Sequence, residues 1–182
     1  MTVMISLLRG VNVGGHRKVK MEDLRALYES LGFEDVQTYI NSGNVLFRTA
    51  QRDLVRLRKR IEDAIEGACG FRSHVILRTP SDLRGVIARN PFAARTGMDP
   101  SRLAIHFLAA DPSAEARDQV LAIDAAPEEL RIGGRELYIY FPNGMARPKL
   151  SMPVVEKTLR TTGTSRNWNT VRKLLEIAEK LE

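Results

Sequence analysis

The sequence has a single cysteine and no long apolar run. One thiol, Cys69, can neither close an internal disulfide nor form a metal site alone. We interpret it as a buried or incidental residue, with a catalytic thiol as the alternative. The apolar opening, Thr2 to Leu8, is too short to span a bilayer and lacks the basic start and cleavage site of a signal peptide. We therefore expect a cytoplasmic protein that has no membrane partner.

Patterns that carry metal or nucleophilic chemistry are also missing. His16, His74 and His106 lie far apart, and no cysteine, histidine or carboxylate spacing forms a ligand set, so we expect no metal and no cofactor. No serine stands in a Gly-x-Ser-x-Gly turn, so the sequence offers no evident nucleophile with its base.

What is present is ordinary globular composition with a modest basic excess. Of 182 residues, 43% are hydrophobic and 27% are charged, which fits one compact unit or two packed halves. The net charge of +6 divides into +4 over residues 1–80 and +2 over residues 81–182, without a basic tail. This balance permits an anionic partner, with the first half favoured.

Residues 1–80 predict one ferredoxin-like half. Apolar residues at three- and four-residue spacing predict helices, and short β-prone runs bounded by turn residues predict strands. The strands are expected at 3–8, 36–40, 45–47 and 74–77, and the helices at 21–31 and 52–68. The order βαββαβ is that of a four-stranded antiparallel sheet with both helices on one face.

Residues 81–100 predict a connecting helix and loop, with Thr79, Pro80 and Asp82 marking the helix start. Residues 101–182 predict a second half in which the last helix takes the place of a fourth strand. Its elements are expected as a strand at 103–109, a helix capped by Asp111-Pro112, a hairpin of 130–132 with 136–141, a helix near 154–159 and a final helix from Trp168. The fold class is therefore α+β, with two ferredoxin-like halves and a C-terminal helix.

Three stretches, Leu7–Gly15, Thr38–Phe47 and Ser165–Val171, carry a family resemblance. Together they resemble the bacterial domain-of-unknown-function family DUF1697, over essentially the whole chain. The resemblance implies an α+β fold of two ferredoxin-like halves and implies no activity.

The loop from Arg9 to Arg17 is the main candidate for binding. Glycines between a strand and a helix can present backbone N–H groups to an anion. The spacing of Gly10 and Gly15 matches a P-loop, but His16 and Arg17 replace its lysine and hydroxyl residue, so we expect no ATPase or GTPase.

The split βαβ topology places this loop beside the hairpin turn and the segment 67–72. Side chains that could face one concavity are Arg9, Asn12, His16, Arg17, Asn41, Ser42, Asn44 and Arg72. The structural alternative is that the glycines allow a sharp path and the asparagines bond to nearby backbone.

Two further features have both a structural and a functional interpretation. Ser165, Asn167 or Asn169 can cap the last helix and Trp168 can pack against the core. Alternatively, Arg166 and Trp168 can supply an anion clamp and a surface for base stacking. Tyr138 and Tyr140 alternate along a strand as in RNA-binding sheets, although the aromatic-rich motif of those sheets is absent.

The leading hypothesis is non-enzymatic binding of a phosphate-bearing ligand, a nucleotide or nucleic-acid backbone, at the Arg9–Arg17 loop. The residues expected to bind it are Arg9, Gly10, Asn12, Gly14, Gly15, Asn41, Ser42, Asn44, Arg166, Asn167 and Trp168. The alternatives are an enzyme that acts on a small anionic substrate with His16 as acid or base, and an interaction module or homodimer. The sequence leaves the oligomeric state open.

Overall fold

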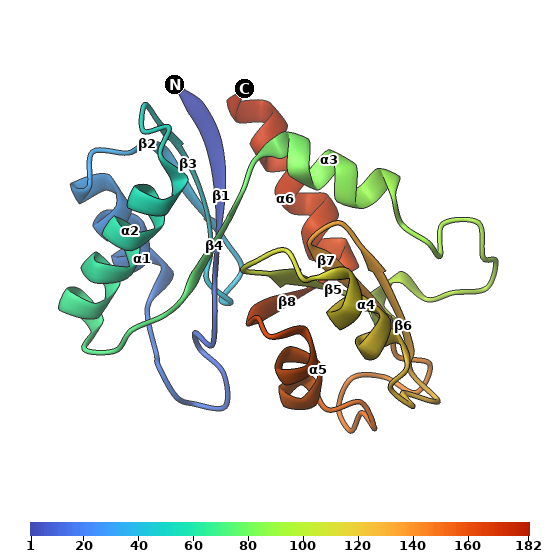
Figure 1. Ribbon diagram of the computed structural model, residues 1–182. Coiled ribbons are helices and arrows are strands. Elements are labelled where there is room, and N and C mark those ends of the chain that lie inside the picture. The colour runs from blue at the N-terminus through green and yellow to red at the C-terminus, as the bar shows by residue number, and fades with distance from the viewer. The chain divides into compact units, whose positions relative to one another are not determined.

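The computed structural model describes residues 1–182, which form two compact units. The first unit comprises Met1–Arg84 with Lys173–Glu182, and the second comprises Gly85–Arg172. Figure 1 shows the same element order, βαββαβ, in each half of the chain. No helix is both long enough and apolar enough to cross a membrane.

The first sheet has the predicted ferredoxin-like arrangement. Its strands are β1 (Thr2–Leu8), β2 (Glu34–Tyr39), β3 (Asn44–Thr49) and β4 (Val75–Arg78), in the antiparallel order β2-β3-β1-β4. Helices α1 (Met21–Ser30) and α2 (Leu54–Cys69) cover one face of it (Figure 1). Leu24 and Tyr28 of α1 and Ile61 of α2 pack there in one apolar core with the inward residues of the strands.

Helix boundaries follow from capping side chains. The Asp53 carboxylate accepts hydrogen bonds from the backbone N–H groups of Val55 and Arg56, so α2 begins after it. The predicted start of α3 (Pro80–Ala88) is confirmed as a reciprocal cap. Asp82 N donates to Thr79 Oγ1 over 3.1 Å, and Thr79 N donates to Asp82 Oδ2 over 2.8 Å.

The second sheet repeats this strand order. It contains β5 (Leu103–Leu108), β6 (Glu129–Gly133), β7 (Glu136–Tyr140) and β8 (Gly163–Asn167), in the order β6-β7-β5-β8. A 3-10 turn, η1 (Pro100–Arg102), precedes β5, and residues of α4 (Ala114–Leu121) and α5 (Met152–Leu159) share one core with the sheet. Helix α6 (Trp168–Leu181) ends the chain, as predicted.

Two local predictions in this half are wrong. The fourth strand exists: β8 pairs with β5, and it escaped prediction because Gly-Thr-Ser-Arg-Asn has no apolar residue to alternate. Helix α4 is capped by Ser113, whose hydroxyl accepts from Ala116 N over 3.2 Å, and not by Asp111-Pro112.

The tyrosines of β7 are covered within their own unit. Tyr138 is fully buried and its hydroxyl donates to the Val86 carbonyl of α3 over 2.6 Å. Tyr140 packs against Phe92, with ring centroids 6.2 Å apart, and lies 5.5 Å from the Arg95 guanidinium. Because both rings are buried, this sheet face offers no surface for base stacking.

Candidate functional site

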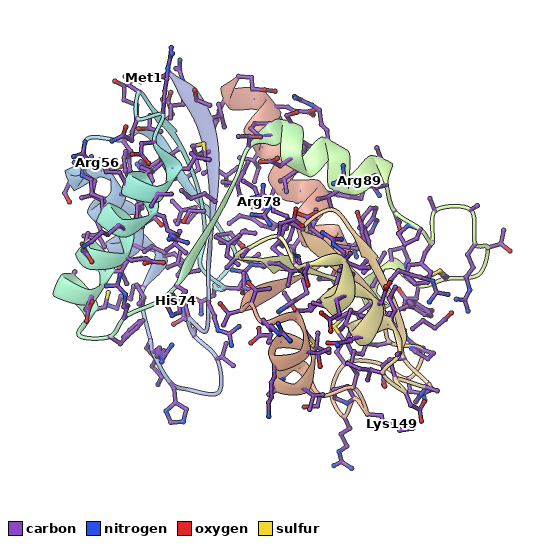
Figure 2. All side chains as sticks on the ribbon, in the orientation of Figure 1. Met1, Arg56, His74, Arg78, Arg89 and Lys149 are labelled. Carbon is purple, nitrogen blue, oxygen red and sulfur yellow. The ribbon has the colours of Figure 1, made fainter.

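Three chain segments meet at one end of the first sheet, as the topology predicts. Leu8 N donates to Gly43 O in the hairpin turn, and Arg9 N donates to the carbonyl of His74, each over 2.9 Å. Figure 2 labels His74, which lies just before β4. The Ser73 hydroxyl donates to Arg9 O over 2.8 Å. A Cβ at Gly43, where φ is +75°, would lie 2.8 Å from Leu8 Cβ, so only glycine fits against β1.

Asn12 closes the base of the Arg9–Arg17 loop. Its Oδ1 accepts from Val19 N over 2.8 Å, while Nδ2 donates to Val19 O over 3.0 Å. The same Nδ2 lies 3.0 Å from Asn41 O and 2.9 Å from Asn41 Oδ1. Asn12 adopts φ +55°, a left-handed conformation that asparagine tolerates. This amide therefore positions the loop against the hairpin turn.

Asn44 and Ser42 fix the turn itself. Asn44 is fully buried, and its Nδ2 donates to Tyr39 O and to Ser42 Oγ, each over 3.0 Å. These bonds are the local turn chemistry that the structural alternative describes.

A cavity of about 790 Å³ opens beside the loop. Its wall comes from the loop, the first turns of α1, the hairpin turn and the C-terminal end of α2. The lining residues are Asn12, Gly15, Lys18, Val19, Lys20, Asp23, Leu24, Leu27, Asn41, Ala68 and Cys69. Of the residues expected to bind a ligand, Asn12, Gly15 and Asn41 are brought together here.

The charge at this cavity comes chiefly from two lysines that were not predicted. Lys18 and Lys20 are exposed on either side of the buried Val19, and neither forms an ion pair. Lys20 also stands at the N-cap of α1, where no side chain bonds to the first N–H groups of the helix. The basic run from Arg17 to Lys20 is the sequence signal that could have identified them.

Cys69 and Asp23 are the other titratable groups of the wall. Burial, with a smaller contribution from the Asp23 carboxylate, raises the pKa of the Cys69 thiol. The thiol is therefore protonated at neutral pH, which makes it a poor nucleophile.

At the tip of the loop, Gly15 lines the cavity, whereas Gly14 and His16 do not. His16 is exposed, is not among the lining residues, and its backbone N donates to Val13 O over 3.0 Å in a tight turn. The Arg17 guanidinium lies 5.8 Å from the Phe71 ring centroid, while Gly10 and Gly14 have positive φ. Gly10 and Gly14 thus serve the path of the chain.

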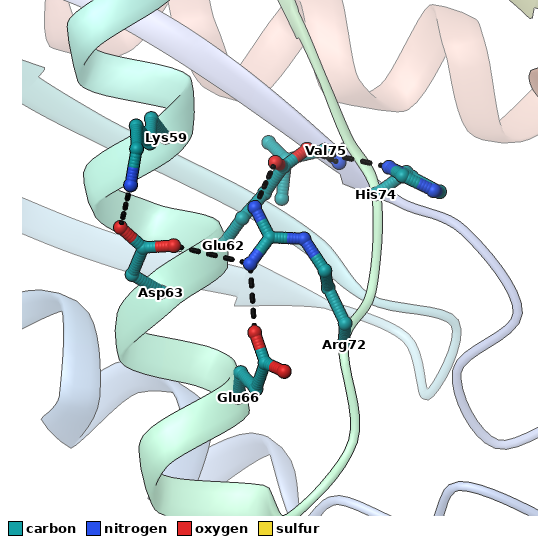
Figure 3. A network of polar contacts seen from close by, with 7 residues as sticks. All are labelled: Lys59, Glu62, Asp63, Glu66, Arg72, His74 and Val75. Atoms are coloured by element: carbon teal, nitrogen blue, oxygen red, sulfur yellow. Dashed lines mark hydrogen bonds and ion pairs between the residues drawn. The ribbon is translucent and has the colours of Figure 1, made fainter.

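Arg72 does not join the predicted concavity, which corrects the sequence interpretation. Figure 3 shows its guanidinium held by three carboxylates of α2, at 2.7 Å from Glu66, 3.0 Å from Asp63 and 3.0 Å from Glu62. The hydrogen bonds to Glu66 and Asp63 raise the pKa of Arg72 above its ordinary value. With its charge offset in this way, Arg72 is not available to bind an anion.

Arg166, Asn167 and Trp168 belong to the second unit, and none of them lines the cavity. Arg166 is buried in β8, donates from Nη1 to Thr164 Oγ1 and to Ser165 O over 2.8 Å each, and burial lowers its pKa to about 10. Asn167 Oδ1 accepts from Asn169 N over 2.9 Å, so Asn167 is the one of the three candidate residues that caps α6.

Comparisons with known proteins agree with this architecture. The chain is 26% identical to a conserved bacterial protein, SP0830 from Streptococcus pneumoniae, whose solved structure aligns over 98% of this chain and 99% of that one with a TM-score of 0.71. No curated protein matches the sequence. A family described as "Protein of unknown function (DUF1697)" matches residues 1–138. Since this match spans most of the sequence, the chain belongs to the DUF1697 family.

Proposed function

We propose that this protein binds a phosphate-bearing ligand in the cavity between the Arg9–Arg17 loop and α1. The observation that carries the proposal is the position of Lys18 and Lys20, two lysines without an ion-pair partner on the wall of that cavity. An ammonium group that no carboxylate neutralises attracts a phosphate, and charge-assisted hydrogen bonds are the stronger kind.

The backbone adds to this attraction. No side chain caps the N-terminus of α1, so its first N–H groups and the positive end of the helix dipole remain available to an anion. The dipole and the two ammonium groups attract an anion, while the Glu22 and Asp23 carboxylates in the first turn of α1 offset part of this attraction. Gly15 brings backbone close to the same space.

The size and the remaining wall favour a nucleotide over a polymer. A volume of about 790 Å³ lies within the range of roughly 300–1,000 Å³ that is typical of small-molecule sites. Leu24, Leu27 and Ala68 supply an apolar surface for a base, while the Asp23 carboxylate can accept hydrogen bonds from sugar hydroxyls.

An enzyme that uses His16 as acid or base gains no support from this geometry. A general acid or base must come within hydrogen-bonding reach of the reacting group, and His16 is not part of the cavity wall. The proposal is therefore binding without catalysis at this site.

Calorimetric titration tests the proposal with a matched pair of ligands. Adenosine 5′-monophosphate should bind at low salt and more weakly as salt rises, and adenosine, which lacks the phosphate, should bind at least tenfold less tightly, about 1.4 kcal/mol. An oligonucleotide that binds where the mononucleotide fails would move the site to a nucleic-acid backbone. No binding of either phosphate ligand at low salt would refute the proposal.

A further inference from the structure

Three side chains of the second unit form a relay that the proposed function does not use. Ser165 Oγ of β8 lies 2.8 Å from Nδ1 of His106 on β5, and Nε2 of the same imidazole lies 3.2 Å from Oε1 of Glu156 on α5. Ser165 is exposed, whereas His106 is only 3% exposed. We propose that Ser165 is a nucleophile for acyl transfer, with His106 as its general base and Glu156 as the positioning residue.

The sheet register creates the contact between serine and imidazole. Ser165 and His106 are direct partners in the antiparallel pair of β5 and β8. Ala109 N donates to Thr162 O in the same register, so Ala109 and Thr162 form a hydrogen-bonded pair. Because hydrogen-bonded and non-hydrogen-bonded pairs alternate along an antiparallel ladder, His106 and Ser165, three positions away, form a non-hydrogen-bonded pair. Side chains approach most closely in such pairs, which explains the short contact.

The same alternation directs the backbone N–H of Ser165 away from β5. Because β8 is an edge strand, this donor points outward beside the Ser165 hydroxyl. A backbone N–H next to a nucleophile is the kind of group that stabilises the oxyanion of an acyl-transfer intermediate.

Gly163 makes room for the imidazole and holds the carboxylate. A Cβ at this position would lie 2.5 Å from His106 Nε2 and 2.4 Å from the Phe107 carbonyl oxygen, so any side chain would displace the ring. Gly163 N donates to Glu156 Oε1 over 3.1 Å, the same oxygen that lies beside Nε2. The contact of this carboxylate with Nε2 is an ion-pair contact without hydrogen-bond geometry, so it acts on the imidazole through its charge. A negative charge at this place favours a proton on Nε2, which leaves Nδ1 to accept the serine proton.

The chemistry that this arrangement supports is hydrolysis of an ester. Ser165 Oγ forms a bond to the ester carbonyl carbon while its proton passes to His106 Nδ1, and the alcohol leaves with that proton as the C–O bond breaks. Water then attacks the acyl-serine by the same proton relay, which releases the carboxylic acid and restores the hydroxyl.

A fluorophosphonate probe tests the nucleophile, because Oγ forms a bond to phosphorus as fluoride leaves. Mass spectrometry should find one adduct, on Ser165, and it should be absent in Ser165→Ala. The matched control Ser30→Ala removes an exposed hydroxyl that donates only to Leu27 O, and its labelling should equal that of the wild type.

The pH profile separates activation from a purely structural hydrogen bond. The wild-type labelling rate should rise as one group with a pKa in the imidazole range loses its proton. His106→Gln should label at least tenfold more slowly without this step, and Glu156→Gln should shift the midpoint to lower pH, since the carboxylate no longer stabilises the imidazolium.

Absence of a Ser165 adduct in the folded wild-type protein would overturn the proposal. A labelling rate that follows hydroxide with no step near the histidine pKa would do so as well, and it needs no variant that could fail to fold. Neither result bears on the cavity of the first unit.

Discussion

The Asn12→Ala substitution should destabilise the first unit, because Asn12 alone ties the loop to both Val19 and the hairpin turn. The change removes four part-buried or exposed hydrogen bonds to Val19 and Asn41, which at about 0.5 kcal/mol for each, the lower end of the usual range, costs roughly 2 kcal/mol. Alanine at the left-handed φ of +55° adds about 1 kcal/mol. The expected loss of unfolding free energy is therefore about 3 kcal/mol.

Urea unfolding followed by circular dichroism measures this loss, and Asn12→Gly divides it into its parts. Glycine also loses the hydrogen bonds but adopts positive φ without strain, so it should cost only about 2 kcal/mol. If Asn12→Ala changed the unfolding free energy by less than about 0.5 kcal/mol, the value usual for an unremarkable surface position, Asn12 would not close the loop.

Three further variants probe packing and ionisation. Gly43→Ala should destabilise by at least about 2 kcal/mol more than Gly15→Ala in the same urea assay, because both have positive φ but only Gly43 meets Leu8 at 2.8 Å; equal losses would contradict the packing argument. Burial raises the pKa of Tyr138 from its usual value near 10 to about 12, and the nearby Glu136 adds to the shift. The neutral phenol is thus favoured in the folded state, so stability should be complete below pH 10 and decline between pH 10 and 12. In Tyr138→Phe the alkaline decline of the melting temperature should be smaller, and an unchanged decline would assign it to other groups such as Tyr28.

The first sheet was accessible from the sequence because its strands are short apolar or β-prone runs bounded by turn residues, and its helices carry apolar residues at three- and four-residue spacing. Strand β8 could not be predicted in this way. Its buried residues Thr164 and Arg166 owe their positions to pairing with β5 and not to any apolar character. Tertiary pairing of this kind has no local signature.

The candidate sites were likewise predictable from the sequence only in part. Topology placed Asn12 and Asn41 together, and the structure joins them by hydrogen bonds. The cavity itself needs the first turns of α1 and the end of α2, so Lys18 and Lys20 became visible only with the packing of these helices. The contact of His106 with Ser165 joins residues 59 positions apart through a strand that the sequence did not predict.

The most direct test of the proposed binding site uses Cys69, the only thiol of the chain and a residue of the cavity wall. The raised pKa of Cys69 slows its alkylation, so the assay uses excess iodoacetamide at alkaline pH. The alkylation rate should fall when adenosine 5′-monophosphate occupies the cavity. In the Lys18→Gln/Lys20→Gln double variant, protection should need at least tenfold more ligand, which corresponds to a loss of about 1.4 kcal/mol of binding free energy. The control Lys157→Gln removes one exposed lysine of α5 and should need no more ligand than the wild type. An alkylation rate that saturating nucleotide leaves unchanged, or protection that survives loss of both lysines, would contradict the account.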